Sequence, residues 1–137
     1  MRCVFDSNVL ISALLTPNST PRRALGLALQ SGKLLLSSAL LAELYEVLSR
    51  KQFRQYVDEE DVRKFLAALA GEAEWVEPTA GIKACRDPKD DKILDLAVSG
   101  HAFCIVTGDS DLLVLSPFRG IQILSADQFL ALPRSAD

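Results

Sequence analysis

The sequence predicts an α/β fold: a single three-layer domain over residues 1–137, with helices on both faces of a mostly parallel sheet of short strands. Two observations favour this fold. Short apolar runs, typical of buried strands, alternate along the chain with longer segments that have helical periodicity. Hydrophobic residues make up 49% of the chain and charged residues 24%, which indicates a folded globular chain and not a disordered one.

The expected elements are separated by capping and turn residues. In chain order we predict a strand at 2–5, helices at 9–15 and 21–30, a strand at 34–36, a helix at 38–50, a helical turn at 53–57, a helix at 58–70, a strand at 75–76, a loop at 77–86, a helix at 89–99, a strand at 103–106, a helical turn at 111–115, a strand at 121–124 and a helix at 126–131.

Local signals justify several of these boundaries. Thr20 before Pro21 has the pattern of a helix cap followed by proline at the first helical position. The four acids at 58–61 suit the positive end of a helix dipole. Gly100 ends the helix that Asp87 and Pro88 begin, and a serine caps the last helix.

Composition and charge exclude several classes of protein. The chain has 18 acids against 15 lysines and arginines, a net charge of −3, which disfavours a strongly basic nucleic-acid binder. Three cysteines without paired spacing exclude a disulfide scaffold and give no zinc-site pattern. Asp6 and Asn8 interrupt the apolar N-terminus, which therefore does not resemble a signal peptide, and no uncharged run is long enough to span a membrane. We expect a cytoplasmic protein with no membrane partner.

Carboxylates lie where ligands bind in parallel sheets. Asp6 follows the first predicted strand and Asp109 follows the fourth, so both lie at the carboxyl edge of the sheet. Glu43 lies on the helix after the second strand, and Asp90 and Asp91 open the helix that leads into the fourth. Carboxylates held together stay ionised only if a cation neutralises them, and Mg²⁺ or Mn²⁺ suits an all-carboxylate site. Such a site activates water for attack on a phosphoryl group.

Each acid also has a purely structural interpretation. Asp6 could cap the predicted helix at 9–15, and Asp87 could cap the predicted helix at 89–99. Glu43 could be a solvated helix residue. Asp90 and Asp91 could be favourable charges in a first helical turn, and the two acids at 109 and 111 could be turn and capping residues. Their joint placement at one edge of the sheet is what favours a site.

Four motifs in this order resemble the PIN-domain nuclease family over essentially the whole chain. They are VFDSNVLISA at 4–13, LAEL at 41–44, DPKDDKIL at 87–94 and VTGDSDL at 106–112. The third and fourth motifs are most similar to the bacterial, VapC-like branch, described as toxins of toxin–antitoxin systems. The resemblance implies a PIN-like fold and hydrolysis of RNA phosphodiesters by activated water, with Mg²⁺ or Mn²⁺ as cofactor. It also implies a homodimer that a small antitoxin holds inactive.

The resemblance implies roles for individual residues. It makes four residues the catalytic, metal-binding acids: Asp6, Glu43, Asp91 and Asp109. Asp91 is preferred at the third position because apolar Leu94 follows at next-turn spacing, although Asp90 could share the metal or replace it. Asp111 is a further ligand or the cap of the next turn, and Asn8 and Thr107 orient ligands or water. Weaker candidates for contacts with the RNA backbone are Arg86, Lys89 and Lys92.

Two other functions remain open from the sequence. In the first, Asp6 is the nucleophile of an aspartyl-phosphate enzyme, although Asn8 stands where a second acid is expected and no lysine follows Asp109. The second is a non-catalytic nucleic-acid-binding or assembly module on the same fold. The acidic balance does not exclude nucleic acid, because leaving out the seven acids in or near the predicted pocket changes the formal net charge from −3 to +4. The high hydrophobic fraction predicts further burial against a second copy or an antitoxin.

Overall fold

A sheet of five parallel strands forms the centre of the computed structural model, which describes residues 1–133. In space the strands lie in the order β3-β2-β1-β4-β5, and every neighbouring pair is parallel. Their bounds are β1 (Arg2–Phe5), β2 (Lys33–Leu36), β3 (Glu74–Trp75), β4 (Cys104–Val106) and β5 (Gln122–Leu124). The predicted α/β fold is therefore confirmed. The last four residues of the predicted domain, 134–137, lie outside the described part of the chain.

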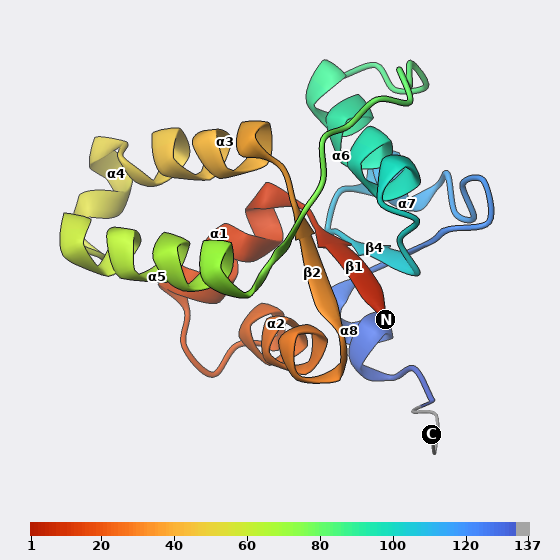
Figure 1. Cartoon of the computed structure of the whole chain (residues 1–137). Helices are drawn as coiled ribbons and strands as arrows, with labels where there is room; N and C mark the ends of the chain where they lie inside the picture. Colours follow the sequence, from red (N-terminus) through yellow and green to blue (C-terminus); the bar gives the residue numbers. More distant parts are fainter. Residues whose placement is uncertain (134–137) are drawn as a thin grey trace.

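Eight helices connect and cover these strands within residues 1–133. They are α1 (Ser7–Leu15), α2 (Thr20–Ser31), α3 (Ser38–Leu48), α4 (Lys51–Arg54), α5 (Glu59–Glu72), α6 (Pro88–Ser99), α7 (Ser110–Leu113) and α8 (Ala126–Leu130). Figure 1 shows α3 and α5 side by side, joined through α4 into a hairpin that extends from the sheet. None of the described helices is both long and apolar enough to cross a membrane.

Most helix boundaries lie within two residues of the predicted ones, and local hydrogen bonds explain the differences at α2 and α4. The cap of α2 is Ser19, not Thr20, because the Ser19 hydroxyl accepts the Arg22 N–H at 3.2 Å. The helical turn expected at 53–57 begins earlier, at α4, and continues through a hydrogen bond from the Val57 N–H to the Phe53 carbonyl.

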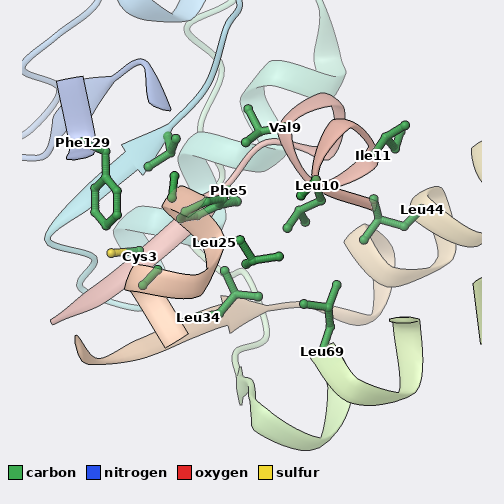
Figure 2. Packing of buried hydrophobic residues seen from close by; sticks show 14 of the residues in the cluster. Cys3, Phe5, Val9, Leu10, Ile11, Leu25, Leu34, Leu44, Leu69 and Phe129 are labelled. Carbon is green, nitrogen blue, oxygen red and sulfur yellow. The ribbon is translucent and has the colours of Figure 1, made fainter. Parts of the chain in front are cut away.

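The two faces of the sheet bury separate hydrophobic clusters, which gives the molecule three layers. Cys3, Phe5 and Leu34 point to one face and pack against α1, α2, α3, α5 and α8, as Figure 2 shows for part of this cluster. There the rings of Phe5 and Phe129 meet edge to face, with centroids 5.9 Å apart. The alternate strand residue Val4 points to the opposite face, which α6 and α7 cover. Burial on both faces explains why the strands are continuous apolar runs.

Capping side chains distinguish Asp6 from the other acids at helix starts. Asp87 accepts the Lys89 N–H at 2.9 Å and Asp109 accepts the Asp111 N–H at 2.9 Å, so both cap their helices. Asp6 precedes α1 in the same position, but its side chain forms no capping hydrogen bond. The capping interpretation therefore does not explain Asp6, whose carboxylate points elsewhere.

Candidate active site

Asp6 and Thr107 directly follow two adjacent strands, β1 and β4, at the carboxyl edge of the sheet. The Asp6 N–H donates to the Val106 carbonyl at 2.9 Å, which extends the ladder past Phe5. The Thr107 hydroxyl, which is fully buried, donates to Asp6 Oδ2 at 2.8 Å. The Ser7 hydroxyl lies 3.4 Å from the other oxygen, Asp6 Oδ1. These contacts fix the orientation of a buried carboxylate.

Thr107 also connects Asp6 to Asp109. Its hydroxyl oxygen accepts the Asp109 N–H at 3.0 Å, so one buried side chain contacts both acidic segments. Asp109 is half-buried and caps α7. As predicted from the sequence, the ends of β1 and β4 thus bring Asp6 and Asp109 to one place, and Thr107 lies between them.

Electrostatics identify Asp90 and Glu43 as neighbours of this pair. Burial, together with the charges of Asp109 and Glu43, raises the pKa of Asp6 above its ordinary value, although hydrogen bonds from Thr107 and Ser7 oppose the rise. Burial, the charge of Asp109 and a hydrogen bond shared with it, and the charge of Asp6 raise the pKa of Asp90 to about 6. The charges of Asp6, Asp90 and Asp109 thus act on one another, and we call these three residues the carboxylate cluster; the charge of Glu43 on α3 also acts on Asp6.

Helix periodicity explains why Asp90 is in the cluster. It is buried on the face of α6 that also buries Ile93, Leu94 and Ala97, three, four and seven residues further on. That face packs against the sheet, so Asp90 points toward the strand ends.

Asp91 is the residue that the sequence analysis preferred as the third metal-binding acid. It directly follows Asp90 on α6, so its side chain points in a different direction and contacts a loop. Its Oδ1 accepts the N–H groups of Ala84 at 2.9 Å and Cys85 at 2.8 Å. These hydrogen bonds lower the pKa of Asp91. Of these two neighbours, Asp90 is the one on which the charges of Asp109 and Asp6 act, and the choice of the third metal ligand stays a prediction.

Asp95 also contacts this loop, a contact that our sequence analysis did not predict. One turn after Asp91, its carboxylate accepts the N–H groups of Ala80 and Gly81, both at 2.9 Å, and the Ser99 hydroxyl. Burial raises its pKa, but these hydrogen bonds outweigh burial and the net pKa is lowered. The signal was present in the sequence, because acids four residues apart lie on one helix face. Together Asp91 and Asp95 hold the 79–85 segment against α6.

The remaining predicted site residues lie outside the carboxylate cluster. Arg86 forms an ion pair with Asp111 at 3.1 Å, so the charge of each side chain is already paired. Asn8 is exposed, and among residues 1–133 its side chain forms no hydrogen bond with the acids. Lys89 and Lys92 are exposed on α6 and line a pocket together with Glu43.

The cluster fits a hard divalent cation in donor chemistry. Its groups are carboxylates, which Mg²⁺ and Mn²⁺ prefer, and burial together with their mutual repulsion raises the pKa values of Asp6 and Asp90. Positive charge placed between them would relieve that repulsion. As arranged in residues 1–133, no three carboxylate, imidazole or thiol groups come close enough together to enclose an ion.

Replacing Thr107 by Val should disrupt the cluster while preserving side-chain shape. The variant loses the donor to Asp6 and the acceptor for the Asp109 N–H, leaving buried polar groups unpaired. We expect the affinity for Mn²⁺ to fall by about 10–100-fold, the usual cost of losing a partner that orients ligands. Isothermal titration calorimetry measures this affinity, and Thr107→Ser, which keeps the hydroxyl, is the matched control. Equal Mn²⁺ affinity in Thr107→Val and the native protein would contradict the orienting role.

The fold and the site define a parallel α/β protein with a carboxylate cluster at the carboxyl edge of its sheet. The chain belongs to the PIN domain family, which its sequence matches over residues 2–111. An uncharacterized protein of Methanocaldococcus jannaschii is 32% identical over 117 residues, which cover 84% of this chain and 75% of that protein. The predicted resemblance to PIN domains is confirmed.

Two solved structures share the fold. VapBC2 from Rickettsia felis, bound to a DNA fragment from their promoter, contains a chain that is 17% identical, with a TM-score of 0.62. FitAcB from Neisseria gonorrhoeae contains one that is 21% identical, with a TM-score of 0.57. In both cases the similarity covers 90% of this chain and 97% of the other.

Proposed function

We propose that this protein is a metal-dependent endoribonuclease. The observation that carries the proposal is the carboxylate cluster of Asp6, Asp90 and Asp109 at the ends of β1, β4 and the start of α6, in a chain of the PIN domain family. Ligands bind outside the carboxyl ends of parallel strands, so the cluster lies where substrate is expected.

In this proposal Asp6, Asp90 and Asp109 hold Mg²⁺ or Mn²⁺, with Glu43 completing the set from α3. When bound, the ion polarises a phosphoryl oxygen and lowers the pKa of a bound water. Thr107 keeps Asp6 and Asp109 in position by contacting both. Holding the acids by buried hydrogen bonds before substrate arrives reduces the reorganisation that the reaction requires. Asp91 and Asp95 act indirectly, by fixing the segment that precedes α6.

RNA hydrolysis tests the proposal directly. We expect the purified protein to cleave labelled RNA in Mg²⁺ or Mn²⁺, to stop when EDTA is added, and to lose activity by about a hundredfold or more in Asp6→Asn. Ser38→Ala, an exposed change at the start of α3, is the matched control and should cleave RNA as the native protein does. Equal cleavage by the native protein and Asp6→Asn would exclude this site. A stable acyl-phosphate on Asp6 would instead indicate the aspartyl-phosphate reaction.

We also propose that the chain is the toxin of a toxin–antitoxin pair, acts in the cytoplasm and forms a homodimer. Support comes from the likeness to VapBC2 and FitAcB and from an apolar groove between α3 and α5 that Tyr45 and Trp75 border. Both side chains are nearly half exposed, at 45% and 48%. Co-expression with the product of the neighbouring reading frame should give a stable complex in which RNA cleavage is suppressed. Gel filtration with light scattering decides between the dimer and a monomer.

A further inference from the structure

Two buried thiols lie side by side on strands β1 and β4. Cys3 and Cys104 are register partners of these adjacent parallel strands, and both side chains are fully buried. The Cys104 thiol donates a hydrogen bond to the Cys3 sulfur, with 3.7 Å between the two Sγ atoms. Figure 2 shows the Cys3 sulfur within the packed hydrophobic cluster. The fold thus pairs two cysteines that are 101 residues apart in the sequence.

Strand geometry allows a covalent bond between these two sulfurs. Adjacent strands lie about 4.8 Å apart, and the Cα atoms that a disulfide joins are usually about 4.4–6.8 Å apart. Both thiols belong to the cluster on one face of the sheet, so rotations about the side-chain bonds bring the sulfurs from 3.7 Å to a bond of about 2.0 Å. Neither strand needs to change its register.

The amino edge of the sheet gives an oxidant a route to the pair. Arg2 and Phe103, the residues that directly precede the two cysteines, are exposed. A hydrogen bond from the Phe103 N–H to the Arg2 carbonyl, at 2.7 Å, closes the strands over the thiols. Strand ends open locally far more often than whole domains unfold, so the thiols become accessible one residue from this edge.

The hydrogen bond between the thiols makes Cys3 the first to react. It lowers the pKa of Cys3, which accepts it, and together with burial raises the pKa of Cys104, which donates it. The thiolate is the nucleophilic form of cysteine, so Cys3 attacks an oxidant and Cys104 remains the thiol that resolves the product.

We propose that Cys3 and Cys104 are a modification site, which a hydroperoxide oxidises to a disulfide that joins β1 to β4 and stabilises the fold. First the Cys3 sulfur attacks a peroxide oxygen, the O–O bond breaks, and Cys3 becomes a sulfenic acid while water or an alcohol leaves. The Cys104 sulfur then attacks the Cys3 sulfur, the S–O bond breaks, and the departing hydroxide takes the Cys104 proton as water. Each sulfur loses one electron, and the peroxide gains two.

This site is separate from the carboxylate cluster. The cysteines lie toward the amino edge of β1 and β4, whereas Asp6 and Thr107 follow the carboxyl ends of the same strands. The disulfide therefore leaves the cluster unoccupied, and the proposal does not depend on the nuclease function. Its effect is on the unfolded chain, because closing a loop of this length restricts that chain strongly.

Peptide mapping of the native protein tests the bond itself. The folded full chain is treated with hydrogen peroxide, free thiols are alkylated in denaturant, and trypsin digestion follows without reductant. We expect peptides 3–22 and 93–119, which contain Cys3 and Cys104, to be joined and to separate in dithiothreitol. Recovery of these peptides unlinked, with the two cysteines unreacted or present as sulfinic acids, would overturn the proposal.

Thermal unfolding tests the stabilising effect of the bond. Peroxide treatment should raise the Tm of the native protein by roughly 5–15 °C, and dithiothreitol should reverse the rise. Cys85→Ala is the matched control, because it removes the remaining cysteine, which lies in the loop before α6, and should show the same linked peptides and the same rise. Cys3→Ala should show no rise relative to its own untreated Tm.

The two measurements remain decisive if a variant folds poorly. The peptide map needs only native protein, and each Tm is compared with that of the same protein before oxidation. Linked peptides in a protein whose Tm is unchanged or lower would overturn the stabilising effect. Because neither measurement uses RNA or a metal ion, failure of the nuclease function would leave both results intact.

Discussion

Asp90→Asn should abolish metal-dependent RNA cleavage, whereas Asp91→Asn should leave it within a few-fold of the native rate. The two residues are adjacent and chemically identical, so the difference tests the geometry of α6. Asp90 is buried, and its pKa is raised by burial and by the charges of Asp109 and Asp6. Removing its charge takes a ligand from the cluster, and we expect a loss of about a hundredfold or more.

Replacing Asp91 should instead change the hydrogen bonding of the loop that precedes α6. Its carboxylate accepts two backbone N–H groups, from Ala84 and Cys85, and an amide in its place accepts them more weakly. Hydrogen exchange of these two amides should therefore accelerate in Asp91→Asn and stay unchanged in Asp90→Asn.

Single-turnover cleavage at saturating Mn²⁺ and amide exchange followed by mass spectrometry together make the comparison. If Asp91→Asn lost as much activity as Asp90→Asn, the two residues would contribute equally to cleavage. The assignment of Asp90 as the third acid of the cluster would then be wrong. The Asp91→Ala variant extends the test, because it removes the hydrogen-bond acceptor altogether and should increase exchange further.

Much of the fold follows from local sequence signals. The strands at 2–5 and 104–106 are short and mostly apolar and buried, and the polar residues Asp6 and Thr107 directly follow them. Because parallel strands share a carboxyl edge, the order of elements alone brings Asp6, Thr107 and Asp109 together. That part of the candidate site is predictable since it depends on strand ends, which have little freedom.

The side-chain contacts of α6 and its loop are less predictable, because they depend on rotation about the helix axis. The spacing from Asp91 to Leu94 favoured Asp91, but Asp90 has apolar partners at three, four and seven residues, a fuller match to one buried face. The Arg86–Asp111 ion pair joins residues that no periodicity relates, so only the tertiary structure reveals it.

Metal-free protein should become more stable when Asp90 is replaced by Asn. The pKa of Asp90 is raised from 3.8 to about 6. Between these values the folded protein keeps a proton that the unfolded chain has lost, so the stability from this group falls as pH rises through that range. Above pH 6 the ionised carboxylate opposes folding. Removing it should increase the free energy of unfolding at pH 7.5 by on the order of 1 kcal/mol, or a few degrees in Tm.

Mg²⁺ should reverse this order of stability. A ligand that binds only the folded state stabilises it by roughly 2.7 kcal/mol at a hundredfold excess over its dissociation constant, and native protein should gain this while Asp90→Asn gains much less. Differential scanning calorimetry at pH 5 and 7.5, with EDTA or Mg²⁺, measures the Tm and the free energy of unfolding of both proteins. Asp91→Asn is the control of opposite sign, because its carboxylate has a lowered pKa and its loss should reduce Tm. A lower Tm for metal-free Asp90→Asn than for native protein at pH 7.5 would show that Asp90 stabilises the fold, and the repulsion that a cation is proposed to relieve would be absent.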